Sequence, residues 1–147
     1  MPDGEFLGIH TPRLDDKGRL FLPARFRDDL GERIVVTKGP DRCVTIYPYP
    51  VFKDRVLDRL AAGSSASRNV RHLRRALLAH ASTETVDRQG RVTIPTALRQ
   101  WAGLERECAV IGQGSYLEVW DSAAFAAVEA SSDDVLDALD EEGVVLL

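Results

Sequence analysis

Two stretches of thirteen residues decide the fold: DDKGRLFLPARFR at Asp15–Arg27 and DRQGRVTIPTALR at Asp87–Arg99. They lie 72 positions apart and share Asp, Gly, Arg, Pro and a final Arg at identical spacing, with apolar residues between them. After a one-residue insertion the match resumes, so that Phe52 corresponds to Phe125. Self-similarity at a fixed offset indicates a repeated structural unit. The chain is therefore predicted to contain two copies of one unit.

Each copy has the same order of predicted elements. A glycine marks a tight turn between short β-branched or apolar runs, and a proline then ends the strand and begins a short helix. The predicted short helices are Ala24–Arg27 and Thr96–Arg99. The predicted strands are Arg13-Leu14, Arg19–Leu22, Ile34–Thr37 and Val44–Tyr47 in the first copy, and Thr85-Val86, Arg91–Ile94, Cys108–Ile111 and Leu117–Trp120 in the second.

Half of this chain is too short to bury an ample core alone, because roughly 60–70 residues give only marginal stability. We therefore expect the halves to exchange strands and to share one core, in a mainly β fold with helices of the α+β class. The expected organisation is a first repeat at 6–60, a linker and basic helix at 61–80, a second repeat at 81–130, and an acidic tail at 131–147.

The net charge of −4 conceals an asymmetry along the chain. All 19 basic side chains and 13 of the 23 acidic ones lie in residues 1–106, which gives this body a charge of +6. Residues 107–147 hold the other 10 acids and no base. A basic body is compatible with nucleic-acid binding, because a phosphate backbone responds to local charge. The acidic end is equally compatible with a segment that merely keeps the protein in solution.

Composition also excludes several classes. With 44% hydrophobic residues the chain is not expected to be disordered, and it has neither a membrane-length apolar run nor a signal sequence, so we expect a cytoplasmic protein. Cys43 and Cys108 form no metal or disulfide motif and are predicted to be buried thiols. The three histidines and the single Gly-Gln-Gly run at 112–114 fit no catalytic motif. We therefore expect no enzyme activity, no cofactor, no metal and no small-molecule substrate.

The repeated Asp-x-x-x-Arg turn permits two interpretations. Asp15 and Arg19, like Asp87 and Arg91, flank a glycine turn and can face each other across its neck. Such a pair could be a clasp that fixes the hairpin, or it could hold an arginine toward phosphates or guanine edges. Repetition shows common descent and does not choose between them.

The motifs closely resemble the MraZ family of bacterial transcriptional regulators over about residues 6–128. In the first half the resemblance rests on Phe6-x-Gly8, Leu14-Asp15-x-Lys17-Gly18-Arg19-Leu20-x-Leu22-Pro23 and Val44-x-Ile46-Tyr47-Pro48. In the second half it rests on Asp87-x-x-Gly90-Arg91-Val92-x-Ile94-Pro95, Leu98-Arg99, Ala102-x-Leu104, Val110-Ile111-Gly112 and Leu117-Glu118-Val119-Trp120. One departure is that the second turn has Arg88-Gln89 where the first has Asp16-Lys17, so the turns are expected to contribute unequally.

The resemblance implies a tandem swapped-hairpin β-barrel of the AbrB-like superfamily, assembled as a ring-shaped homo-oligomer. It implies sequence-specific binding to double-stranded DNA at G-rich direct repeats in the promoter of a division and cell-wall gene cluster that begins with the regulator's own gene. The family's signature falls on Asp15, Arg19, Asp87 and Arg91, with Arg13 and Lys17 as adjacent phosphate contacts. The expected protein is a nucleoid-associated repressor of its own operon.

Other features keep alternatives open. A helix predicted from about Asn69 carries Arg68, Arg71, Arg74 and Arg75, which could meet nucleic acid, a partner's acids or only solvent. Tyr47 and Trp120 are expected to fill a core or an interface rather than to stack on bases. The tail at 131–147 could be an amphipathic surface helix, could dock on the basic helix, or could wrap a protein partner. That last possibility defines an alternative function, an antitoxin-like interaction module.

Overall fold

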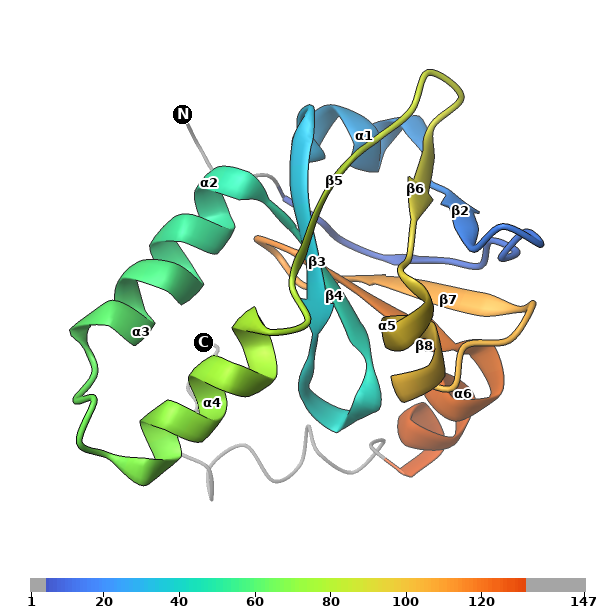
Figure 1. Ribbon diagram of the computed structural model, residues 1–147. Coiled ribbons are helices and arrows are strands. Elements are labelled where there is room, and N and C mark those ends of the chain that lie inside the picture. The colour runs from blue at the N-terminus through green and yellow to red at the C-terminus, as the bar shows by residue number, and fades with distance from the viewer. Residues whose placement is uncertain (1–4, 132–147) are drawn as a thin grey trace, which may run out of the picture.

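The computed structural model describes residues 5–131, in which two antiparallel sheets are flanked by helices (Figure 1). The strands are β1 (Ile9–His10), β2 (Arg19–Phe21), β3 (Arg33–Lys38), β4 (Val44–Pro48), β5 (Ser82–Thr85), β6 (Arg91–Thr93), β7 (Cys108–Gly112) and β8 (Leu117–Asp121). The helices are α1 (Ala24–Leu30), α2 (Tyr49–Phe52), α3 (Asp58–Ala62), α4 (Arg68–Leu78), α5 (Thr96–Trp101) and α6 (Ser122–Ser131). A 3₁₀ turn spans Pro40–Arg42, and a π-helical turn at Lys53–Leu57 joins α2 to α3. The predicted α+β class is confirmed.

The two halves exchange strands within the six-stranded sheet. Its order is β1-β7-β8-β4-β3-β5, so each outer strand pairs with a strand from the other half of the chain. At one edge β1 pairs with β7, at the other β5 pairs with β3, and β4 pairs with β8 in the middle. Within residues 5–131 the strands form two sheets and do not close into a single barrel.

The second sheet is a two-stranded ribbon made of β2 and β6, one strand from each half. Leu20 is the register partner of Val92, and these two residues are also equivalent in the repeat. The pseudo-twofold axis that relates the halves therefore passes through this pair. Both side chains are fully buried, so the ribbon turns one face toward the core and the other toward solvent.

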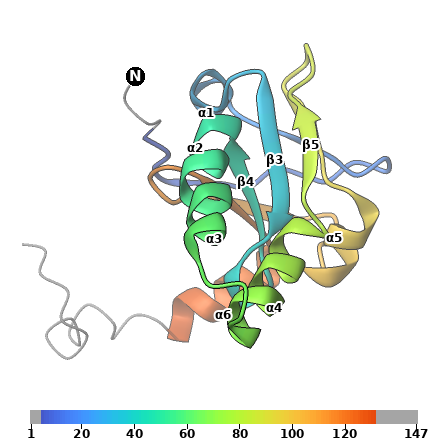
Figure 2. The same cartoon turned by 60° about the vertical axis from the view of Figure 1, so that its left-hand side comes forward.

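One core serves both halves. The main cluster contains Phe6, Leu20 and Phe26 from the first half and Val92, Ile94 and Leu98 from the second. On the opposite face of β3, Val35 packs in a second cluster with Phe52, Val56 and Leu60, and helices α2, α3 and α4 cover this face (Figures 1 and 2). Neither half could keep its buried surface without the other, as the length argument predicted.

The prediction of ordinary strands before each Asp-x-x-x-Arg turn was wrong in detail. Arg13 and Leu14 form only isolated bridges, to Glu107 and Leu20, because the Leu14 N–H donates to the carbonyl of Arg106 in the other half. In the second half the strand is Ser82–Thr85 and stops before Val86. The helix expected from about Asn69 is α4, capped by the Ser67 hydroxyl, which accepts from the Val70 N–H.

No helix in the described part of the chain is long and apolar enough to span a membrane. The acidic tail expected at 131–147 lies outside the described residues beyond Ser131.

The buried centre of the ribbon sets the first prediction. Leu20→Ala leaves a cavity against Val92 and the shared core, and we expect it to lower the free energy of unfolding by about 2–5 kcal/mol. The adjacent Phe21 is 50% exposed on the other face, so Phe21→Ala should cost less than about 1 kcal/mol. Urea denaturation of both variants measures the difference. Equal losses would show that the ribbon does not hold the core together.

Candidate nucleic-acid interface

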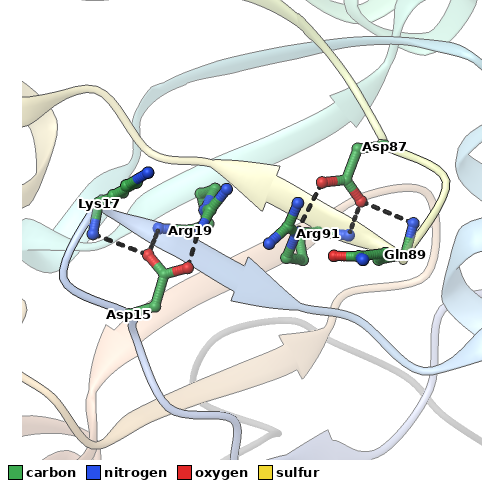
Figure 3. A network of polar contacts seen from close by, with 6 residues as sticks. All are labelled: Asp15, Lys17, Arg19, Asp87, Gln89 and Arg91. Atoms are coloured by element: carbon green, nitrogen blue, oxygen red, sulfur yellow. Dashed lines mark hydrogen bonds and ion pairs between the residues drawn. The ribbon is translucent and has the colours of Figure 1, made fainter.

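The first Asp-x-x-x-Arg turn is a clasp closed by five hydrogen bonds, of which Figure 3 shows the three to the Asp15 carboxylate. One of the others runs from the Asp15 N–H to the Arg19 carbonyl at 2.9 Å. Oδ1 of Asp15 accepts the backbone N–H groups of Lys17 and Arg19, each at 2.9 Å. Oδ2 accepts Nε–H of Arg19 at 2.8 Å, and the Gly18 N–H donates to the Asp15 carbonyl at 3.0 Å. Gly18 has φ +78°, a conformation that favours glycine. The aspartate thus fixes both the turn backbone and the arginine side chain.

The second turn repeats this geometry. Asp87 accepts the N–H groups of Gln89 at 2.9 Å and Arg91 at 2.8 Å, and its other oxygen accepts Arg91 Nε–H at 2.7 Å. Gly90 has φ +84° and donates to the Asp87 carbonyl at 3.0 Å. The two turns have the same hydrogen bonds although the residues around them differ. The Asp, Gly and Arg that they share therefore determine this geometry.

Each clasp leaves the outer edge of its guanidinium available. Only Nε of Arg19 and of Arg91 donates to an acceptor within residues 5–131, so the Nη groups keep their donors. The two side chains are 28% and 22% exposed. In Figure 3 they lie side by side on the ribbon, with Asp15 and Asp87 on its outer flanks. A guanidinium held by Nε can present two parallel N–H groups to a phosphate or to O6 and N7 of guanine.

The clasps lower the pKa of both aspartates below the ordinary value of 3.8. The main cause is the backbone N–H of Arg19 or Arg91, and the guanidinium adds to it against a partial desolvation that acts in the opposite direction. Both carboxylates are therefore charged at neutral pH. Because the folded pKa is depressed, the stabilisation from each clasp is present above the unfolded pKa and is lost as the pH falls through the folded value.

Arginines cross between the halves to support the turns. A methyl group placed on Gly18 would lie 2.6 Å from Cζ of Arg99, which belongs to α5 of the other half. A methyl group on Gly90 would lie 2.7 Å from Nη1 of Arg27, which belongs to α1. In the sequence each of these arginines follows its own turn, Arg27 nine residues after Gly18 and Arg99 nine residues after Gly90. Pseudo-symmetry together with strand exchange could have predicted these contacts between the halves, because the exchange places each short helix over the turn of the other half.

The other predicted contacts lie at the margin of this surface. Arg13 forms an exposed ion pair with Glu107 at 2.9 Å, between Nε and Oε1. The Lys17 side chain is exposed at the tip of the first turn. Phe21, which sequence analysis did not single out, lies half exposed on β2 two residues beyond Arg19.

Helix α4 lies away from β2 and β6, which carry the clasps (Figure 1), and its Arg68, Arg71 and Arg75 are exposed. Arg71 Nη1 donates to the carbonyls of Ser65 and Ala66, and Arg68 Nε donates to His72 Nε2. These bonds secure the loop before α4 and the helix itself. Within residues 5–131 no carboxylate pairs with the α4 arginines.

The remaining candidates are structural. Trp120 is buried and stacks edge-on against Phe125, and its Nε1–H donates to Glu118 at 3.0 Å. Cys43 and Cys108 are buried as predicted, and desolvation raises the pKa of Cys108 to about 11. The described residues contain no group of His, Cys, Asp and Glu side chains arranged to hold a metal ion.

The strand exchange, the shared core and the duplicated clasp define the class: a pseudo-dimer in one chain, built from two swapped-hairpin repeats. The family model described as "MraZ protein, putative antitoxin-like" matches this sequence twice, over residues 6–75 and 77–146. The chain belongs to the MraZ family.

Curated relatives agree over most of the chain. A protein of Thermobifida fusca named transcriptional regulator MraZ is 49% identical over 137 residues, which cover 93% of this chain and 95% of that protein. Proteins of the same name from Clavibacter michiganensis and Kineococcus radiotolerans are 50% and 51% identical over 120 and 116 residues. These cover 82% and 79% of this chain, and 83% and 80% of the relatives. The shared name is that of a regulator and not of an enzyme.

The hydrogen bonds of the clasp predict how it titrates. The pKa values of Asp15 and Asp87 should both lie below 3.8. The measurement is an NMR titration that follows the side-chain carboxyl chemical shifts against pH. In Arg19→Ala the pKa of Asp15 should rise while staying below that value, because the backbone N–H of residue 19 still donates. Asp87 is the internal control and should not move. A wild-type Asp15 that titrates at or above pH 3.8 would contradict the clasp.

The crossing arginine predicts the cost of a methyl group at Gly18. Gly18→Ala strains a positive φ, which costs about 1–2 kcal/mol, and also displaces Arg99 from its hydrogen bonds to Ile94 and Thr96. Gly114 has the similar φ of +81° with no atom within 4 Å of the added methyl, so Gly114→Ala should cost only the backbone strain. We expect Gly18→Ala to be the more destabilising by at least about 1 kcal/mol in thermal or urea unfolding. If the two variants are equally stable, Arg99 does not support the turn.

Proposed function

We propose that this protein is a transcriptional regulator that binds double-stranded DNA in a sequence-specific manner through its two arginine clasps. The observation that carries this proposal is the pair of guanidinium groups on one exposed ribbon face, each anchored at Nε with its Nη donors uncommitted in the described residues. A purely structural clasp would need no such exposed edge. The names of the MraZ relatives support the same conclusion.

In this proposal the residues have different roles. Asp15 and Asp87 orient Arg19 and Arg91, whose Nη edges contact guanine O6 and N7 or nearby phosphates. Arg13 and Lys17 add phosphate contacts beside the first turn, and Arg13 exchanges its ion pair with Glu107 for a phosphate. Because bidentate arginine contacts favour guanine, this arrangement fits the G-rich direct repeats that the family resemblance implies.

Charge supports the same partner. The +6 body in residues 1–106 contains both clasps, while 10 acids are concentrated after residue 106. The local field around the ribbon is therefore attractive to a phosphate backbone despite the negative total. Binding should weaken as salt rises, since each neutralised phosphate releases counterions.

Assembly completes the proposal. A single turn makes few contacts, whereas a homo-oligomeric ring presents several ribbons to successive DNA repeats, each new engagement occurring at high effective concentration. Occupancy of the promoter at the head of the division and cell-wall cluster would exclude polymerase and repress the protein's own operon. A protein bound at this promoter would reside on the nucleoid. Both repeats, at 6–60 and 81–130, would lie within the ring.

The test is a binding titration against DNA from immediately upstream of the protein's own gene, with scrambled competitor, at two salt concentrations. Wild type should prefer the upstream DNA and bind it more weakly at the higher salt. Arg19→Ala should reduce affinity by roughly tenfold or more, because a bidentate guanine contact is worth about 1–3 kcal/mol.

Arg75→Ala is the matched control, since Arg75 is an exposed arginine of α4, away from the ribbon. It should bind like wild type. Circular dichroism and size-exclusion chromatography check that Arg19→Ala remains folded and assembled. If wild type does not discriminate upstream from scrambled DNA, the proposal fails for this target.

A further inference from the structure

The two arginines that cross between the halves differ in how they are held. Arg99 donates through Nε to the Ile94 carbonyl at 2.9 Å and through Nη2 to Oγ1 of Thr96 at 2.7 Å. The side chain of Arg27 makes no hydrogen bond to any residue in 5–131, and its Nε is buried without an acceptor. The arginine that crosses to the first turn therefore has hydrogen-bond acceptors for its guanidinium, whereas the one that crosses to the second turn has none in residues 5–131.

The sequence explains part of this difference. Ala24 stands at the repeat position of Thr96, so α1 has no hydroxyl where α5 supplies one to its arginine. Arg27 is only half-buried, and a guanidinium carries five N–H donors. The Nη groups of Arg27 are not buried and donate to no residue in 5–131, so an external acceptor such as a phosphate can still bind them.

Charge around the two turns differs in the same direction. Residues 15–19 contain two acids and two bases, whereas residues 87–91 contain Asp87 against Arg88 and Arg91. Adding the arginine that crosses from the other half gives +1 at the first turn and +2 at the second. The second turn, which lacks the equivalent of Lys17, thus has the stronger attraction for an anion.

We propose that Arg27 binds a DNA backbone phosphate at the second turn, so that this turn receives its phosphate contact from the opposite half of the chain. The proposal rests on the DNA-binding function proposed above. The Nη groups of Arg27 meet phosphate oxygens beside Gly90, while Arg91 faces the bases. Arg99 is instead a positioning residue: its bonds from Nε to Ile94 and from Nη2 to Thr96 hold the guanidinium against the first turn.

The experiment compares Arg27→Ala with Arg99→Ala in the full chain, measuring affinity for the upstream DNA across a salt series. Arg27→Ala should bind roughly tenfold more weakly and should reduce the slope of log affinity against log salt by about 0.9 for each bound subunit. The loss should be the same on upstream and scrambled DNA, as expected for a phosphate contact. Arg99→Ala should leave the salt slope unchanged.

A second pair of variants tests the acceptor argument without removing either arginine. Ala24→Thr gives Arg27 the hydroxyl that Arg99 already has, and should weaken DNA binding while preserving or raising thermal stability. Thr96→Ala frees one donor of Arg99 and should not weaken binding. Circular dichroism confirms folding of all four variants.

An unchanged salt slope in folded Arg27→Ala, or equal slope changes in Arg27→Ala and Arg99→Ala, would overturn the proposal. So would full DNA affinity in Ala24→Thr. These failures differ from failure of the DNA-binding function itself, which would appear as wild-type protein without salt-sensitive preference for the upstream DNA.

Discussion

The pairing of β2 with β6 is the constraint on which the rest of the molecule depends. It joins the halves at Leu20 and Val92, and the carbonyl of each turn glycine accepts a hydrogen bond from the strand of the other half. Ile94 N–H donates to Gly18 at 2.8 Å, and Leu22 N–H donates to Gly90 at 2.9 Å. The ribbon that carries both turns therefore exists only when the halves are paired, and so does the candidate interface.

The clasp contributes orientation more than stability. Both ion pairs are partly exposed, and solvent screening leaves such pairs only a small contribution to stability. What the aspartate provides is restriction: it holds the backbone at two N–H groups and the guanidinium at Nε, so an arginine that would sample many rotamers keeps one edge outward. Less conformational entropy is then lost on binding, which is how preorganisation raises affinity. The same three hydrogen bonds at Asp87 extend this argument to the second turn.

Sequence predicted best where the cause is local. The glycine turn, the proline that starts α1 and α5, and the contact of Asp15 with Arg19 each depend on residues within a few positions of one another, and the structure contains them all. The repeat also predicted that strands would be exchanged. It could not specify that Arg13 and Leu14 would bridge to different halves, or that Arg27 would reach Gly90. Equivalence between two copies says which residues play the same part, whereas contacts between copies depend on packing distances that spacing does not encode.

Duplication within one chain has a consequence for the DNA that the proposed interface would fit. Two identical subunits related by a twofold axis present identical turns and match an inverted repeat, because operator symmetry mirrors protein symmetry. Here the axis through Leu20 and Val92 relates two unequal turns. Lys17 of the first turn is equivalent to Gln89 of the second. The Arg99 side chain has hydrogen-bond acceptors, whereas the equivalent Arg27 has a buried Nε without one. Such a ribbon has a direction. Copies of it arranged head to tail around a ring would meet DNA in one orientation, and a direct repeat is the sequence arrangement that suits them.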